Sequence, residues 1–310
     1  MSRSTGCTDS VRLPKARIGP GKADYGIHAG LFVLTLVTMT ILGANLQLGA
    51  DRALLPFVPA SDLVKFAFWK SGLRFSLPLM AILLGHEMGH YLTARRYGIE
   101  TSLPYFLPLP LMIGTLGAFI RIRTPFRSKR ELFDVGVGGP IAGFLIAVPI
   151  LFLGLSSPAS AGNIPPGSLV LGDSLLSYFA TLVIPGSPRY LITTACHPFV
   201  LAAVFGLFVT ALNLIPLGQL DGGHALEAVS SRARRRISIP VAVGLIILGA
   251  WTTQLVWMLW GILGVTMLRR HPAVPDEAVP LDFKRKAVAW GVLLILIVSF
   301  APIPIYEMGP

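Results

Sequence analysis

Repeated apolar runs are the feature that most constrains how this chain folds. They cover residues 27–49, 72–95, 131–155, 190–217, 237–268 and 286–304. A helix that crosses a bilayer needs about 20 mostly apolar residues, and each run reaches about that length. A soluble protein has about 25% charged residues, whereas only 13% of this chain is charged and 53% is hydrophobic. The pattern predicts an all-α polytopic membrane protein.

The basic residues indicate the number and direction of the spans. The run at 237–268 is too long for one untilted helix, and both of its ends are basic. We therefore expect two short spans with a turn near residues 251–253, which gives about seven transmembrane helices in all. This topology places 21 of the 26 Lys and Arg residues on one side, which the positive-inside rule assigns to the cytoplasm. The net charge of +11 then reflects topology, and we expect no nucleic-acid partner.

The second apolar run contains the sequence His86-Glu87-Met88-Gly89-His90. Residues four apart share one face of a helix, so both histidines can bind the same metal ion. Glu87 is close enough to hold a water molecule on that metal. Zinc is the expected ion, because two imidazoles, a carboxylate and an open position form a common catalytic zinc site. Two buried histidines satisfied by backbone are the alternative, but ionisable groups within a membrane are costly without a function.

An acidic residue follows the fourth run, in the sequence Leu220-Asp221-Gly222-Gly223-His224. A lone Asp at the end of a span is often a helix cap. No third ligand lies close to the two histidines in sequence, so Asp221 is also a candidate metal ligand. The expected topology places Asp221 and His90 toward the same cytoplasmic side, where they can meet.

Residues 101–123 are apolar but do not fit a helix. Pro104, Pro108 and Pro110 exclude a regular helix, and the segment ends in an alternating, strand-like pattern. We expect a small re-entrant β-hairpin near the active site, because irregular backbone is tolerated at membrane depth only against protein or a wet cavity. Its second strand, with Gly117, Ala118 and Phe119, either pairs with an unwound substrate or belongs to a plain membrane-surface loop.

Three stretches together resemble the site-2 protease family of intramembrane zinc metalloproteases. They are the HEMGH sequence, Gly139-Pro140-x-Ala142-Gly143, and Asn213-x-x-Pro216-x-x-x-Leu220-Asp221-Gly222-Gly223. The resemblance covers roughly residues 72–225. Within it, the chain is most similar to the subgroup that lacks a PDZ domain, which includes chloroplast homologues. The loop at 156–189 is too short for such a domain.

The resemblance implies a site and an activity. One zinc ion would be held by His86, His90 and Asp221, with Glu87 as the catalytic acid and base. Asn213 matches a family position thought to help hold substrate or the developing oxyanion. A hydrogen bond that stabilises the interrupted fourth span is the alternative role for Asn213. The implied reaction is hydrolysis of peptide bonds in or near transmembrane segments of membrane-protein substrates.

Two other classes of protein share some of these features. A zinc protease with its motif at the membrane surface would need a downstream Glu ligand, and Glu100 and Glu131 are poorly placed for that. A non-proteolytic zinc-binding membrane protein or transporter has no need for Glu87 beside the metal. The expected partners are a transmembrane protein substrate and membrane lipid. The basic bias fits a bacterial inner membrane, with an organelle membrane as the alternative.

The expected organisation has four parts. They are a basic cytoplasmic tail (1–26), a first span with its connector (27–71), the catalytic core (72–225) and C-terminal spans (226–310). We expect His197 to be structural, since it precedes the helix-starting Pro198, and His224 to lie near the metal or face solvent. Cys7 and Cys196 are far apart in sequence, and we expect no disulfide.

Overall fold

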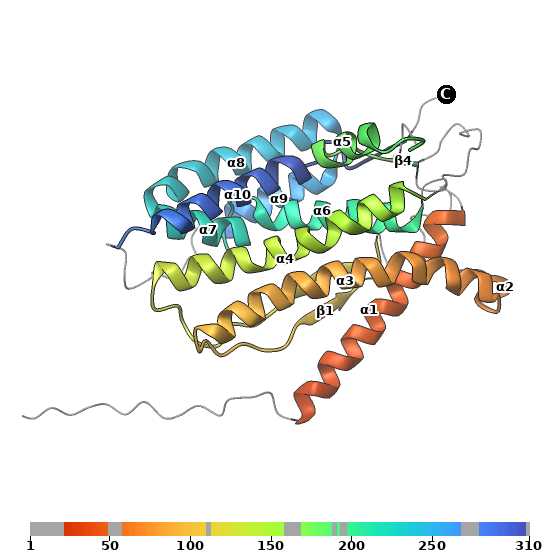
Figure 1. The fold of residues 1–310 in the computed structure, drawn as a ribbon, viewed down its shortest axis with the longest axis horizontal. Helices are drawn as coiled ribbons and strands as arrows, with labels where there is room; N and C mark the ends of the chain where they lie inside the picture. The colour runs from red at the N-terminus through yellow and green to blue at the C-terminus, as the bar shows by residue number, and fades with distance from the viewer. Residues whose placement is uncertain are drawn as a thin grey trace, which may run out of the picture.

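A computed structural model describes residues 22–48, 58–109, 113–157, 169–187, 191–192, 197–267 and 279–307. These residues are mostly helical and include two small sheets. The helices lie side by side in one bundle (Figure 1). Cys7, Cys196 and most of the basic tail lie outside the described residues.

Three neighbouring helices form the centre of the bundle. Helix α3 (Phe66–Arg96) packs against α4 (Lys129–Leu155), and α4 packs against α6 (Pro198–Leu214). Helix α1 (Lys22–Leu48) covers another side of α3 (Figure 1). Fully buried apolar side chains fill these contacts, among them Phe75, Leu79, Leu151 and Leu201. Apolar packing of this kind holds the helix that carries the HEMGH sequence in place.

Local sequence sets where the helices begin. The Ser128 side chain accepts a hydrogen bond from the Glu131 backbone N–H and caps α4. Pro198 is the first residue of α6, and the His197 ring accepts a hydrogen bond from the Phe199 N–H. Proline suits the first helical position because its missing N–H has no partner there anyway. His197 therefore has the structural role that the sequence predicted.

Four helices in the described part of the chain are long and apolar enough to cross a membrane. They are α1, α3, α4 and α8 (Ser231–Thr252). The other expected spans correspond to the shorter helices α6, α9 (Leu255–Met267) and α10 (Phe283–Ser299). These helices support an integral membrane protein.

The C-terminal helices match the expected division, with one difference. Thr253, with φ 56°, ends α8 in a left-handed cap, so the turn lies where the sequence predicted it. The arginines of residues 232–236 precede the apolar run at 237–268, but they belong to the first turns of α8. The Ser230 side chain caps this helix by accepting a hydrogen bond from the Ala233 N–H, which explains the earlier start.

A β-hairpin lies beside the central helices, as the sequence predicted. Strand β1 (Tyr105–Pro108) pairs antiparallel with β2 (Thr115–Phe119), and Phe106 lies opposite Ala118. Helix α1 packs on β1. In this two-stranded sheet β2 has one edge without a partner strand among the described residues.

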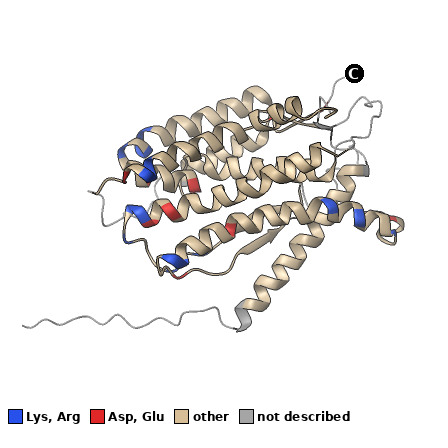
Figure 2. Ribbon diagram, in the orientation of Figure 1, with Lys and Arg blue, Asp and Glu red and all other residues tan. Residues whose placement is uncertain are grey.

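The remaining elements are short. A second sheet has the order β4 (Leu191–Ile192), β3 (Leu169–Leu171) and β5 (Ile305–Glu307), with antiparallel pairs. The short helices are α2 (Ala60–Leu63), α5 (Leu175–Val183) and α7 (Asp221–Val229). Basic residues gather where α4, α8 and α10 begin, at one end of the bundle (Figure 2).

Candidate metal centre

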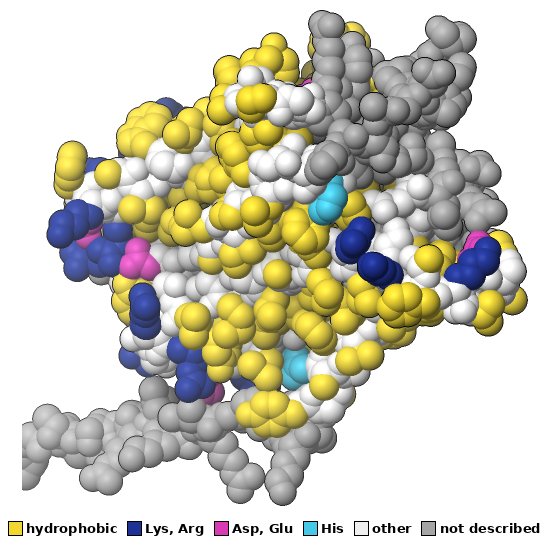
Figure 3. Space-filling view, turned by 45° about the vertical axis from the view of Figure 1, so that its right-hand side comes forward, with side chains coloured by type: hydrophobic (Ala, Val, Ile, Leu, Met, Phe, Trp, Pro, Cys, Tyr) yellow, Lys and Arg dark blue, Asp and Glu magenta, His cyan; other side chains and the backbone are white. Residues whose placement is uncertain are grey.

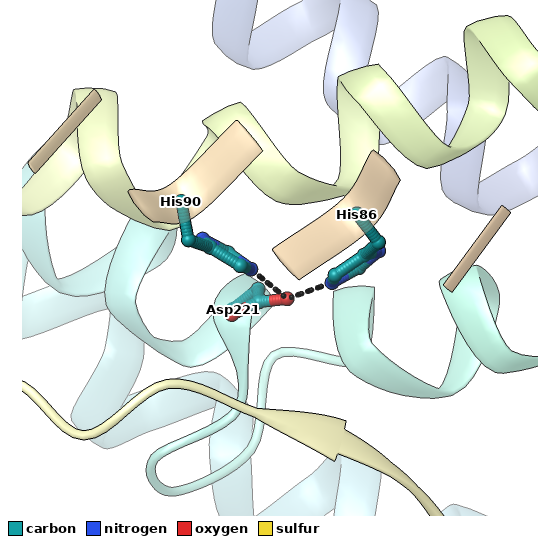
Figure 4. A group of neighbouring side chains, drawn as sticks. All are labelled: His86, His90 and Asp221. Carbon is teal, nitrogen blue, oxygen red and sulfur yellow. Dashed lines mark hydrogen bonds and ion pairs between the residues drawn. The ribbon is translucent and has the colours of Figure 1, made fainter. Parts of the chain in front are cut away.

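His86 and His90 point from α3 toward Asp221, the first residue of α7 (Figure 4). The Asp221 Oδ2 atom lies 3.1 Å from the Nε2 atom of His86 and 3.2 Å from that of His90. Both histidines are buried. The structure thus brings together a pair from one helix and a carboxylate 135 positions away from His86.

The three side chains fit a metal ion. One ligand atom from each of them lies within 4.8 Å of the other two. Tetrahedral zinc with ligands at about 2.0–2.2 Å places neighbouring donor atoms about 3.3–3.6 Å apart. The two Nε2–Oδ2 distances are close to that spacing, so a small shift admits an ion. Two imidazoles and one carboxylate leave a fourth position open, which is the arrangement of catalytic rather than structural zinc sites.

The orientation of His90 is set by α4. The Nδ1 atom of His90 lies 2.7 Å from the Val135 carbonyl oxygen, so Nδ1–H donates to that carbonyl. This hydrogen bond directs Nε2 toward Asp221 and makes it the metal-facing nitrogen. Gly139 supplies the necessary space, because a Cβ atom there would lie 2.1 Å from the His90 Nε2. Gly143, the last residue of the Gly-Pro-x-Ala-Gly sequence, lies against the other histidine, since a Cβ atom there would be 3.2 Å from the His86 Nδ1.

The position of Asp221 depends on the glycine that follows it. Helix α6 ends at Leu214, and a short connection returns the chain so that α7 begins against that end. A Cβ atom on Gly222 would lie 1.9 Å from the Leu214 carbonyl oxygen. Only glycine permits this approach of two backbones without a shift. The Asp-Gly-Gly sequence thus carries the carboxylate into the bundle beside α3.

Glu87 and Asn213 lie at the same centre. The Glu87 side chain is buried, and its carboxylate accepts a hydrogen bond from the Ile120 backbone, which directly follows β2. The Asn213 Nδ2 atom lies 3.3 Å from the His86 Nε2. Asn213 is in the last turn of α6, so α3, α6 and α7 each contribute a polar side chain here.

A cavity of about 240 Å³ opens beside these groups. His86, Glu87, His90, Asn213 and Asp221 all line it. Ala118 and Phe119 of β2 also line it, whereas Gly117 is not among the lining residues. A peptide segment in this cavity would therefore lie between the polar centre and the strand.

One group at the site was not identified from the sequence, and another, His224, was expected either near the metal or facing solvent. The Val135 carbonyl belongs to the backbone, and no residue type at position 135 signals its role. His224 lines the cavity, and its ring lies 6.4 Å from the Phe126 ring, centroid to centroid. Its proximity to Asp221 in sequence was the available signal, and the structure places it at the cavity wall rather than away from the site.

Comparison with known proteins agrees with this geometry. The model of peptidase family M50 matches residues 74–251, which include HEMGH, the glycine-rich start of α4 and Asp221. The chain belongs to peptidase family M50. The resemblance to the site-2 protease family is thereby confirmed. No solved structure matches the chain.

Curated relatives extend the similarity beyond the region that the family model matches. The chain is 31% identical over 292 residues to the probable zinc metalloprotease EGY2, chloroplastic, of Oryza sativa subsp. indica, covering 93% of this chain and 52% of the relative. It is 29% identical over 294 residues to the probable zinc metalloprotease EGY1, chloroplastic, of Oryza sativa subsp. japonica, covering 88% of this chain and 50% of that relative. It is also 28% identical over 301 residues to the probable zinc metalloprotease EGY1, chloroplastic, of Arabidopsis thaliana, covering 90% of this chain and 53% of that relative. The chain therefore spans about half the length of these relatives.

Proposed function

We propose that this protein is an intramembrane zinc metalloprotease that hydrolyses peptide bonds in or near transmembrane segments of membrane-protein substrates. The observation that carries the proposal is the convergence of His86, His90 and Asp221 on one point beside a buried Glu87. Family membership and the names of the curated relatives support it.

His86, His90 and Asp221 would hold one zinc ion. When bound, zinc would lower the pKa of its water molecule to about 7 and polarise the substrate carbonyl. The Glu87 carboxylate accepts a proton from the water that attacks that carbonyl. Glu87 then donates the proton to the departing amine nitrogen as the C–N bond breaks. The same carboxylate therefore acts first as a base and then as an acid.

Asn213 and β2 would position the substrate. The Asn213 amide lies next to His86 and can donate a hydrogen bond to the oxyanion that develops on the scissile carbonyl. A substrate helix must unwind before cleavage, because its own hydrogen bonds hide the scissile bond. The open edge of β2, at Gly117, Ala118 and Phe119, can accept the freed backbone as an added strand. Two of these residues line the cavity.

The proposed topology has seven transmembrane helices, with the hairpin re-entering the membrane and the metal centre toward the cytoplasmic side. The excess of basic residues on the side where α4, α8 and α10 begin supports this orientation (Figure 2). The same bias supports a bacterial inner membrane. The names of the plant relatives, which describe them as chloroplastic, support an organelle membrane as the alternative.

The test is cleavage of a single-span substrate by the purified full chain in detergent, with wild type beside Glu87→Gln and bound zinc measured in both. We expect cleavage by the wild type, none by the variant, and about one zinc ion in each. A non-proteolytic zinc protein or transporter would bind zinc without cutting any substrate. Equal cleavage by the two proteins would exclude Glu87 as the catalytic acid and base.

A further inference from the structure

A basic pocket of about 710 Å³ lies where α4 and α8 begin. We use the name basic pocket for the hollow whose polar lining is Lys129, Ser230, Ser231, Arg232, Arg235 and Arg236. Four of these residues are cations, and no acidic residue is among the described residues that line it. The metal centre has a separate cavity with different lining residues.

The arginines of the basic pocket lie at an electrostatically unfavourable position. The N-terminal end of a helix carries a partial positive charge, so acidic residues are favoured there and cations are not. Helix α8 has no acidic residue in its first turn, and it begins with four arginines within its first six residues. One of them, Arg234, is turned inward and forms a buried ion pair with Glu227 of α7. In the described part of the chain no carboxylate forms an ion pair with the other three.

A bound anion would remove this cost. The pocket lies at the start of two helices of 27 and 22 residues, whose first backbone N–H groups have no partner within the helix. Helix N-termini and planar guanidinium groups are both suited to phosphate oxygens. The Ser231 hydroxyl, which lines the pocket, also lacks a hydrogen-bond partner among the described residues. The shared chemistry of these groups is recognition of a phosphate.

The surface of α8 beyond the pocket favours a phosphate that carries acyl chains. Arg232 and Arg236 are followed on the same helix face by Ile239, Val243 and Ile247, at intervals of three or four residues. These three side chains are 55%, 45% and 63% exposed. The view in Figure 3 shows hydrophobic side chains across the middle of the molecule, a gathering of basic ones at its left end, and further basic ones toward its right. Helix α8 is also one of the four candidate spans, so its basic end would meet the headgroup layer.

We propose that the basic pocket binds the phosphate headgroup of an anionic phospholipid whose acyl chains lie along the exposed apolar face of α8. Basic pockets between helices at the cytoplasmic surface have the chemistry that such lipids require. The proposal needs the chain to lie in a membrane, but it does not depend on proteolytic activity.

The experiment is native mass spectrometry of the full chain in detergent, titrated with phosphatidylglycerol, phosphatidylcholine or inorganic phosphate. The test variant is the double substitution Arg235→Gln with Arg236→Gln. The matched control is Arg95→Gln with Arg96→Gln, an exposed pair of adjacent arginines at the end of α3. Both variants lose two positive charges, so a difference between them reports the pocket rather than overall charge. The thermal unfolding midpoint of each variant without lipid shows that it is folded.

We expect the wild type to bind phosphatidylglycerol at least about tenfold more tightly than phosphatidylcholine, since each nearby basic residue contributes about 1 kcal/mol to anionic-lipid binding. The pocket variant should lose this preference, and the control should keep it. Equal behaviour of the two variants would overturn the proposal in favour of diffuse surface attraction. Inorganic phosphate that binds as tightly as phosphatidylglycerol would overturn the choice of a lipid.

Discussion

The pair α3–α4 and the helix α8 are all long enough to cross a membrane, yet they are built differently. In the most apolar window of α3, 50% of residues are buried within the protein, and in α4 44% are, against 22% in α8. The central pair is therefore surrounded by protein, and α8 exposes most of its length. On α3 and α4, polar residues and glycines have specific partners, such as His90 with Val135 and Gly139. On α8, charges are confined to one end.

This difference shows what constrains each region. Between α3 and α4, a change of one methyl group alters the position of a functional side chain. On α8, the environment requires only apolar character along the helix and cations where it begins. The predictions below test this comparison.

The largest effect is expected from removing the ligand that joins α7 to α3. Asp221→Ala leaves two imidazoles, so zinc affinity should fall at least about 100-fold, since even indirect partners of a metal contribute 10–100-fold. Zinc content after dialysis measures this. The control is Asp173→Asn, which should keep its zinc. Asp173 lies just after the distant β3, and its carboxylate accepts a hydrogen bond from the Ser177 hydroxyl. Retention of zinc by Asp221→Ala would exclude Asp221 as a ligand.

Two glycine substitutions compare the regions directly. The new Cβ in Gly139→Ala would lie 2.1 Å from the His90 Nε2, so the ring must move. We expect at least a tenfold loss of proteolytic rate, because a displacement of about 1 Å can reduce a rate about 100-fold. Gly244→Ala on α8 meets nothing within 4 Å, and we expect unchanged activity. Initial rates on one substrate measure both, and equal losses would contradict the comparison.

Helix α7, which packs on α4, is joined to α8 by the buried ion pair between Glu227 and Arg234. Glu227→Gln leaves the Arg234 charge uncompensated in a buried site and should cost about 3 kcal/mol of stability. The thermal unfolding midpoint in detergent should fall by several degrees. Lys65→Gln, at an exposed lysine paired with Asp62, should cost less than about 1 kcal/mol. Similar midpoints for the two variants would show that the pair does not stabilise the junction.

The smallest effect concerns the cap of α10. The Asp282 carboxylate accepts a hydrogen bond from the Arg285 backbone N–H and a second one from the Arg285 guanidinium. Both bonds, the first more strongly, lower the Asp282 pKa below its ordinary value of 3.8. The pKa of Asp282 is therefore lower in the folded protein than in the unfolded chain. At pH values well above 3.8 the ionised carboxylate makes its full contribution to stability. Its contribution declines as pH falls through 3.8 toward the folded pKa. Asp282→Asn should therefore flatten the dependence of the unfolding midpoint between about pH 5 and 3. An unchanged slope would assign the acid sensitivity to other groups.

The sequence predicted those parts of the molecule that depend on local patterns. The HEMGH sequence gives two histidines on one helix face, and the prolines of residues 104–110 exclude a helix where the hairpin lies. The family resemblance linked Asp221 to these histidines across 135 positions, and the structure places the three together.

Contacts between distant backbone groups could not be predicted in this way. The Val135 carbonyl holds His90 through an atom that every residue possesses, so its type carries no signal. The start of α8 is a second example, since it precedes the apolar run at 237–268 and depends on the capping hydrogen bond of Ser230. The basic pocket depends on two helix ends 102 positions apart, at Lys129 and Ser231, and their proximity is a property of the fold.

The central claim is that α3 and α7 together form one metal site. Zinc K-edge X-ray absorption spectroscopy on the purified full chain is the decisive measurement, because it counts imidazole ligands and distinguishes sulfur donors from nitrogen and oxygen donors. We expect two imidazole ligands, with all remaining donors nitrogen or oxygen and none sulfur, and the same spectrum in Glu87→Gln. A sulfur ligand, or fewer than two imidazoles, would contradict the assignment of His86, His90 and Asp221.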